Sequence, residues 1–239
     1  MSRRAGALAR LASTAYWKMS ETFSKFIVKR RTFVILRGKV DTSHAENQFQ
    51  VREYATNAGS ILDIYKAIGR YNYYPGMDDD TRVAARLRRG MRFYAAFEGD
   101  RTIAYLWMHS NSQRFFTDVG LFIRKGTKDL WVQDVYVVPE KRGHRLFGDF
   151  IKAVIREYYP GADNLCSDVW QENEPSLRAH RHIGLYVMGS VKCTHIFRRI
   201  LIRRVNVDGM EAYGYKCPRA VLLSNSKYKA FVMTNRNWW

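Results

Sequence analysis

The residues best suited to chemistry lie in the bend at 139–147, between an apolar strand pattern and an amphipathic helix pattern. The first turn of a helix leaves several backbone N–H groups without intrahelical partners, and such groups bind anions well. Gly143 lets the backbone come close to a ligand, and Arg142 and Arg145 could add charge-assisted hydrogen bonds. The bend therefore predicts a phosphate site formed by the main chain of residues 142–147.

Two motifs extend this hypothesis. The string V-x-P-E-x-R-G begins at Val137, and N-x-x-S-x-x-x-H-x-x-I-G-L runs from Asn173 to Leu185. Together they resemble the GCN5-related N-acetyltransferase (GNAT) superfamily, whose members carry V-x-P-x-x-R-G-x-G-x-G/A and N-x-x-S-x-x-x-Y-x-x-x-G-F segments. The resemblance covers residues from about 60 to 195 and leaves both ends of the chain unexplained.

The resemblance implies acetyl-coenzyme A, or another acyl-coenzyme A, as cosubstrate. The pantetheine arm would pair like an extra strand with the backbone near Val137, between strands expected at 130–138 and 164–170. Asn173 and Ser176 match positions that in relatives contact the cofactor arm or order the following helix. The diphosphate would bind the main chain of Arg142, Gly143, His144, Arg145, Leu146 and Phe147.

Two residues depart from the family pattern. Phe147 stands where relatives have glycine or alanine, and it is expected to be a core residue of the helix. Arg145 stands where relatives have glycine, so it either adds a phosphate contact or crowds the turn. The second alternative would make this chain a catalytically silent member that binds coenzyme A or a partner.

Acyl transfer to an amine needs a base for the nucleophile, donors for the thioester oxygen and a proton for the leaving thiolate. Backbone N–H near Val137 could supply the donors. The resemblance places His180 where relatives often have a tyrosine acid, and an imidazole with a pKa of about 6.5 suits that role; the alternative is a histidine on a helix surface. For the base, relatives often have a glutamate at the position that Gln133 occupies here, and a glutamine cannot accept a proton usefully. Asp134 is the substitute base, although strand alternation aims it at the opposite face unless a bulge intervenes.

The remaining pattern predicts an α+β or α/β class, with a mixed, mostly antiparallel sheet, a βαβ crossover and flanking helices. One GNAT-like domain is expected over 45–205, after a basic amphipathic extension at 1–44 and before a basic strand or tail at 206–239. Helices are expected at 61–71, from 81, from 146 and at 176–183, and strands at 32–40, 91–97, 102–108, 115–124, 129–138 and 164–170. Asp78–Asp80 are expected to cap a helix rather than bind metal, and no metal site is predicted.

The charge is concentrated at the ends. Residues 1–44 and 186–239 each hold 10 basic and 2 acidic residues, so each end contributes 10 − 2 = +8 to the net charge of +18 of the whole chain. This favours an anionic partner, such as a membrane surface, or simply solvated charge; a nucleic-acid or membrane-surface binding module is the third functional alternative. Nucleic acid is disfavoured because the middle is nearly neutral. The leading hypothesis is an N-acetyltransferase that acts on a small amine or amino sugar. The protein is expected in the cytoplasm, with peripheral association with a membrane as an alternative, and a homodimer is a further alternative.

Overall fold

The computed structural model describes residues 28–43, 48–71, 79–111, 113–116, 121–124, 126–196, 200–207 and 211–214. The amphipathic helix pattern before residue 28, most of the tyrosine-rich loop before Asp79, and the C-terminal tryptophans lie outside the described residues. Within the described residues, no helix is long and apolar enough to cross a membrane.

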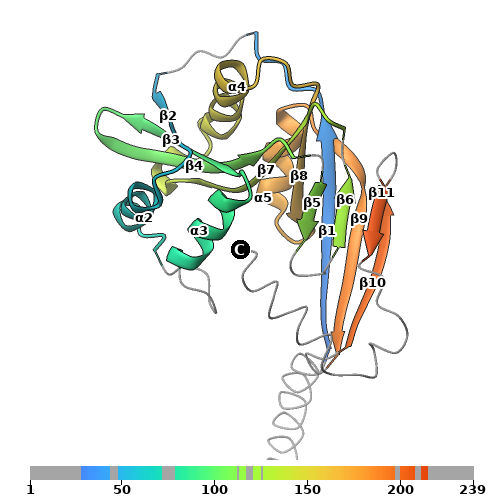
Figure 1. Cartoon of the computed structure of the whole chain (residues 1–239). Coiled ribbons are helices and arrows are strands. Elements are labelled where there is room, and N and C mark those ends of the chain that lie inside the picture. Colours follow the sequence, from blue (N-terminus) through green and yellow to red (C-terminus); the bar gives the residue numbers. More distant parts are fainter. Residues whose placement is uncertain are drawn as a thin grey trace, which may run out of the picture.

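An eight-stranded sheet forms the centre of the fold, in the order β10-β9-β1-β8-β7-β4-β3-β2 (Figure 1). Among the described strands of this sheet, only β7 and β8 run parallel, joined by a crossover through helix α4, Leu146–Tyr158; the other neighbours are antiparallel. This confirms the predicted class and the βαβ crossover. The strands are β1 Val28–Gly38, β2 Gln50–Tyr54, β3 Arg92–Glu98, β4 Arg101–His109, β7 Asp129–Val137, β8 Asn164–Trp170, β9 Tyr186–Ile196 and β10 Ile200–Val207.

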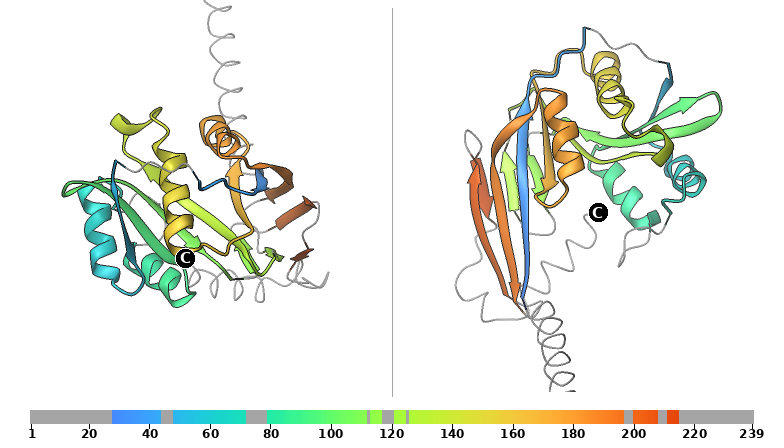
Figure 2. Two further views of the ribbon diagram at one scale, coloured as in Figure 1. Left: turned by 90° about the horizontal axis from the view of Figure 1, so that it is seen from above. Right: turned by 180° about the vertical axis from the view of Figure 1, so that it is seen from behind.

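Alternating side chains give the sheet two buried faces. In β4, Leu106 and Met108 pack with Phe150 of α4, while Tyr105 and Trp107 pack with helix α2, Ala58–Ala67. Helix α5, Glu174–His182, lies on the α4 side, and helix α3, Asp79–Arg88, lies beside α2 (Figure 2). Strand alternation in β4 therefore places α2 and α3 on one face and α4 and α5 on the other.

A second, three-stranded sheet covers the α3 face near the middle of the main sheet. It has the order β11-β6-β5, with β5 Gln113–Phe116, β6 Leu121–Arg124 and β11 Glu211–Gly214. Ile123 of β6 is fully buried against a cluster that includes Phe33, Trp131 and Cys166. The single strand predicted at 115–124 was wrong, because this segment contains two strands that pair with each other.

The predicted boundaries at 44 and 205 do not coincide with the edges of the fold. Strand β1 lies inside the main sheet, bonded to β8 on one side and β9 on the other. Strands β10 and β11 also pair with strands of the fold. In the described residues, the basic ends of the chain therefore contribute central and edge strands rather than separate extensions.

Candidate active site

The parallel strands β7 and β8 separate part-way along their length. They are in register from Asp129 opposite Asn164 to Val132 opposite Ser167, and no further pair joins them in the described chain. Strand β7 nevertheless continues to Val137. A strand edge that has lost its neighbour offers backbone N–H and C=O groups to an extended ligand. The gap is therefore suited to a linear molecule with amide groups.

A β-bulge lies at the point of separation. The register between β4 and β7 shifts there, and Asp134 has a positive φ of 50°. The extra residue turns the Asp134 side chain to the face that Gln133 already occupies. Gln133 Nε2 lies 3.5 Å from Met91 Sδ, and Asp134 accepts a hydrogen bond from Arg86. Both candidate residues thus face α3, and the bulge named as the condition for Asp134 is present.

Asp134 is held in a buried ion pair. Its Oδ2 is 2.7 Å from Arg86 NH1, and the two side chains are 7% and 5% exposed. The hydroxyl of Tyr105 is 3.5 Å from Oδ1. Protonation of Asp134 would leave the guanidinium of Arg86 without its carboxylate counter-ion, which is costly in a buried site. Sequence reasoning missed Arg86, because an arginine in a highly charged helix pattern indicates a solvated surface.

The bend after β7 has the backbone of an anion cradle. A 3-10 turn, η1 Pro139–Lys141, leads to Gly143 with φ of 81° and to Arg145 with φ of 59°. No acceptor in the described part of the chain takes a hydrogen bond from the backbone N–H groups of residues 143–147. Arg145 adopts the left-handed conformation that favours glycine, at a cost of about 1–2 kcal/mol. Its side chain is exposed, so it does not crowd the turn.

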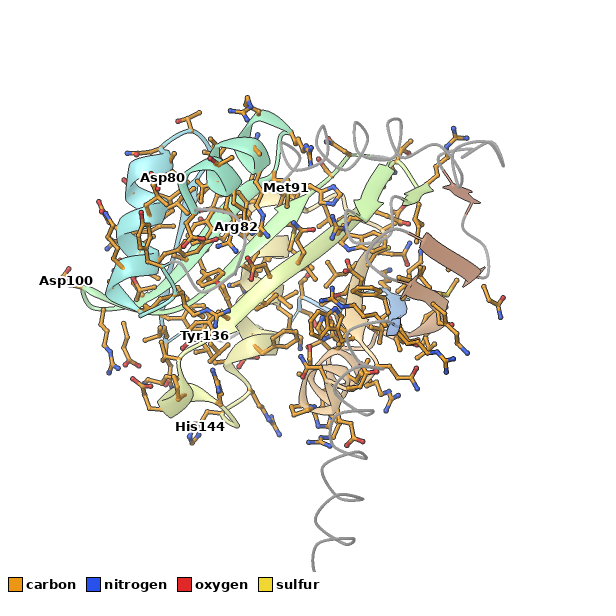
Figure 3. The ribbon with its side chains drawn as sticks, turned by 90° about the horizontal axis from the view of Figure 1, so that it is seen from below. Asp80, Arg82, Met91, Asp100, Tyr136 and His144 are labelled. Atoms are coloured by element: carbon orange, nitrogen blue, oxygen red, sulfur yellow. The ribbon has the colours of Figure 1, made fainter. Side chains whose placement is uncertain are left out.

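Arg142 has a different neighbour from the one expected. Its Nε donates a hydrogen bond of 3.0 Å to the carbonyl of Val137, and its guanidinium lies 5.5 Å from the ring centre of Tyr136. A pantetheine amide that donated to this carbonyl would share it with Arg142 or displace the side chain. Figure 3 shows His144 on this turn, with Tyr136 between it and the α3 side that bears Arg82.

His180 is buried on the opposite, α4 face of the gap. Its Nδ1 is 2.7 Å from the carbonyl oxygen of Ser176, so Nδ1 must carry a hydrogen. Its Nε2 is 2.9 Å from the hydroxyl of Ser167, the last residue of β8 in register with β7. Burial lowers the pKa of His180, with smaller opposing effects from the Ser176 carbonyl and from the charge of Asp168. The alternative of a surface histidine is wrong, because only 3% of the residue is exposed.

The neutral imidazole therefore accepts a hydrogen bond at Nε2 from the Ser167 hydroxyl, and it can give a proton there only in its imidazolium form. Ser167 was missed by sequence reasoning, because a serine within a strand carries no signal of its own. Asn173 caps helix α5 by accepting a hydrogen bond from Ser176 N, which is one of the two roles expected for these residues; contact of Asn173 and Ser176 with the cofactor arm stays a prediction. Phe147 packs edge-on against His180, with 4.8 Å between the ring centres, and borders the core.

A pocket of about 330 Å³ opens beside the turn, on the Tyr136 side. Two ion pairs tie the β3–β4 hairpin to the turn there: Arg101 with Glu140, and Lys141 with Glu98 at 2.6 Å. The pocket is lined by Ala67, Ile68, Asp100, Arg101, Thr102, Tyr136, Val138, Pro139 and Glu140.

No protein-family model matches the sequence, and no curated protein matches it either. Solved structures with a similar arrangement include a functionally unknown conserved protein from Staphylococcus epidermidis, at 8% identity and a TM-score of 0.48. The match covers 78% of this chain and 66% of that one. An acetyltransferase of the GNAT family from Colwellia psychrerythraea matches at 10% identity and a TM-score of 0.44, over 67% of this chain and 53% of that one.

A third structure, from Salmonella typhimurium and solved with its cofactor acetyl-CoA, matches at 21% identity and a TM-score of 0.39. The match covers 61% of this chain and 81% of that one. The chain spans less than two thirds of the length of the first two structures. Because each of the three TM-scores lies below 0.5, no activity passes from these structures to this chain.

Proposed function

We propose that this chain is a GNAT-type N-acyltransferase that moves an acetyl group from acetyl-CoA to the amine of a small molecule or amino sugar. One observation carries the proposal: the gap between β7 and β8 leads directly into a turn whose five successive N–H groups, 143–147, meet no protein acceptor in the described chain. A linear carrier with amides at one end and a diphosphate at the other matches this order of groups.

In the proposed complex, the diphosphate binds the N–H groups of the turn and the helix dipole of α4 adds a favourable field. Arg145, exposed beside these groups, adds a charge-assisted contact. The pantetheine arm lies along the free edge of β7 near Val137. A backbone N–H near Val137 stabilises the negative charge that develops on the thioester oxygen. In the free protein the N–H of Val138 donates a hydrogen bond to the carbonyl of Ile103, so that group would have to change partner to take this role.

The acceptor enters as an ammonium and gives one proton to Asp134, directly or through a water, while Gln133 orients the amine. The free amine attacks the thioester carbon, the new C–N bond forms, and the C–S bond breaks with its electron pair going to sulfur. Of the two protons left on the attacking nitrogen, one stays on the amide and the other passes to solvent, while the thiolate takes one proton from His180 through Ser167. The net products are the amide, coenzyme A thiol and one proton.

His180 supplies the thiolate proton through Ser167 in this scheme. In the imidazolium form both ring N–H groups donate, Nδ1–H to the Ser176 carbonyl and Nε2–H to Ser167 Oγ. The hydroxyl hydrogen of Ser167 is then free to move to the sulfur. Because burial lowers the pKa of His180, its imidazolium is a strong acid that gives up this proton readily.

Calorimetry tests the cofactor part of the proposal. We expect coenzyme A to bind, 4′-phosphopantetheine to bind more weakly, and pantetheine, which lacks every phosphate, to bind weakest. This order follows from a site whose affinity comes from diphosphate on main-chain N–H groups. If titration with coenzyme A gives no heat while circular dichroism shows that the fold is intact, the proposed cofactor binding is wrong.

A catalytically silent coenzyme A-binding protein is the second candidate. It is favoured by the buried pairing of Asp134 with Arg86 and by Gln133, which cannot accept a proton usefully. A free-thiol assay over a panel of amines separates the two candidates, since only the enzyme releases coenzyme A thiol in an amine-dependent manner.

A further inference from the structure

A serine and a histidine meet where β7 and β8 separate. Resting on the proposed acetyl-CoA site, we propose that Ser167 is a nucleophile that takes the acetyl group itself when no acceptor amine is bound, with His180 as its base. The chain then also exchanges the acetyl group between coenzyme A molecules and slowly hydrolyses acetyl-CoA, both through a serine ester. This activity is additional to the direct transfer to an amine.

Ser167 lies at the apex of the gap. It is the last residue of β8 in register with β7, opposite Val132, and β8 continues to Trp170 without another pair to β7 in the described chain. Its side chain lies on the α4 side of the sheet, because Leu165 and Val169, two residues away on either side, pack in the cluster that contains α4. A carrier that starts at the turn after β7 and runs back along the free edge therefore brings its thioester to this hydroxyl.

The hydrogen bonds of His180 fix the direction in which the hydroxyl proton moves. Nδ1 lies 2.7 Å from the carbonyl oxygen of Ser176, which can only accept, so Nδ1 carries the hydrogen. Nε2 of the neutral ring then has the lone pair, and it accepts the hydroxyl hydrogen of Ser167 across 2.9 Å. Burial lowers the pKa of His180 and so favours this neutral form. The neutral form activates the serine, whereas the imidazolium form serves the direct transfer.

This arrangement is that of an activated nucleophile: a hydroxyl within hydrogen-bond reach of a base, and a base that a third group orients. The hydroxyl oxygen of Ser167 accepts no hydrogen bond from the described chain, so its lone pairs are unused. Ser167 and His180 are each only 3% exposed. Bulk water is therefore largely kept from the pair, and the expected partner of the lone pairs is a group that enters the gap.

Core packing alone does not account for the pair. A buried hydroxyl and a buried imidazole each lose hydration, and one hydrogen bond between them returns only part of that cost. Apolar side chains of similar shape would fill the same space at little or no loss of stability. The neighbouring positions Leu165 and Val169 show that this part of β8 is otherwise apolar.

The proposed step balances without a further reagent. Nε2 of His180 takes the hydroxyl proton while Ser167 Oγ forms a bond to the thioester carbon. The C–S bond breaks with its electron pair going to sulfur, and the proton on Nε2 passes to sulfur, so coenzyme A leaves as the thiol. A second coenzyme A thiol reverses the step. Water, activated in the same way by Nε2, cleaves the ester to acetate and one proton and restores the hydroxyl.

Isotope exchange tests for the ester. Acetyl-CoA is mixed with isotopically labelled coenzyme A and no amine, and mass spectrometry follows the label into acetyl-CoA above a protein-free blank. We expect exchange, because the ester returns its acetyl group to the labelled thiol, whereas direct transfer gives none without an amine. Ser167→Ala should lower the exchange rate about a hundredfold, because the nucleophile is lost, and His180→Phe should lower it at least about tenfold, because the base is lost.

Two variants serve as matched controls. Ser190→Ala removes a strand serine from β9, and His182→Phe replaces the exposed histidine of α5, so both should exchange like the parent chain. Peptide mass analysis of the acid-quenched parent should find the acetyl group on Ser167. Hydroxylamine should remove it, because hydroxylamine cleaves esters and leaves the amides of acetylated lysines intact.

Two results would overturn the inference: no exchange in a parent chain that binds coenzyme A by calorimetry, or equal exchange in Ser167→Ala and the parent. If coenzyme A does not bind at all, the proposed function falls as well. If coenzyme A binds and amines are acetylated without any exchange, transfer is direct only, and the serine ester alone is wrong.

Discussion

At the scale of single residues, the buried imidazole of His180 is the proposed source of the proton that the leaving thiolate takes. Its hydrogen bonds to Ser176 and Ser167 fix which nitrogen carries the hydrogen and direct Nε2 to the apex of the gap. We expect His180→Phe to lower kcat by more than tenfold in the free-thiol assay, because the relay to the thiolate is removed.

Ser167→Ala should have a similar effect on kcat, because it removes the hydroxyl that passes the proton from His180 to the thiolate. Ser176→Ala is the control, because it removes only a hydroxyl 3.4 Å from Nδ1 and keeps the backbone carbonyl at 2.7 Å that fixes the tautomer. A loss of less than tenfold in His180→Phe would remove the histidine from the mechanism.

The same histidine predicts how stability depends on pH. Its folded-state pKa lies below the ordinary value of 6.5, so as pH falls below 6.5 the unfolded chain takes up a proton that the folded chain does not. The stabilisation is complete above pH 6.5 and is lost as pH falls toward the folded pKa, with a slope of about 1.4 kcal/mol per pH unit. Urea unfolding between pH 5 and 8 measures this slope.

His180→Phe should unfold with a shallower dependence over the same range of pH. The other titrating groups are common to both proteins, so the difference between their curves isolates the imidazole. Parallel curves would show that burial does not disfavour its protonated form.

Single residues also show what the sequence can reveal. The turn between β7 and α4 was predictable, because proline, glycine and the start of an apolar helix pattern are local signals. Arg86 and Ser167 were not, because their importance comes from Asp134 and His180, which are distant in the chain. The face occupied by Asp134 depended on the bulge, and a single extra residue in a strand leaves no mark in an apolar pattern.

At the scale of elements, the turn at 139–147, where phosphate binding is proposed, keeps its place because α4 and α5 pack closely. A Cβ added at Gly148 would lie 2.7 Å from Ile183 Cγ2, so glycine permits this approach. We expect Gly148→Ala to lower the free energy of unfolding by about 1–3 kcal/mol, because the two helices must move apart. Chemical denaturation measures the change.

Gly161→Ala is the matched control for Gly148→Ala, since a Cβ there would have no neighbour within 4 Å. Because α4 also supports the turn, Gly148→Ala should weaken coenzyme A binding as well, while Gly161→Ala should not. Equal stability of the two variants would contradict the close packing of α4 and α5.

At the scale of the whole molecule, strand order was the least predictable feature. The local pattern predicted a strand near 32–40, but nothing local indicates that it lies between β8 and β9. Those partners follow more than a hundred residues later, and pairing over such distances depends on the assembled core rather than on nearby residues. Part of the basic character at the two ends therefore belongs to strands of the sheet.

Asp129 joins this N-terminal strand to the site. Its carboxylate accepts hydrogen bonds from Arg37 of β1 at 3.1 and 3.3 Å, from Asn164 of β8 at 2.8 Å and from Gly126 N at 3.1 Å. Burial alone would raise the pKa of Asp129, but the bonds from Asn164, Arg37 and Gly126 outweigh burial and hold it below 3.8. Its stabilisation is therefore complete above about pH 3.8 and is lost as pH falls below that value.

Asp129→Asn should destabilise the fold by about 2–4 kcal/mol at pH 7, because Arg37 loses its counter-ion at the start of the paired segment of β7 and β8. Asp163→Asn is the control, since Asp163 is exposed at the other end of the same crossover. Thermal unfolding measures both variants, and on acidification Asp129→Asn should lose less stability than the parent chain does. If the parent and Asp129→Asn unfold alike at pH 7, β1 is not secured through this carboxylate, and the N-terminal strand must be retained by its backbone ladders with β8 and β9 alone.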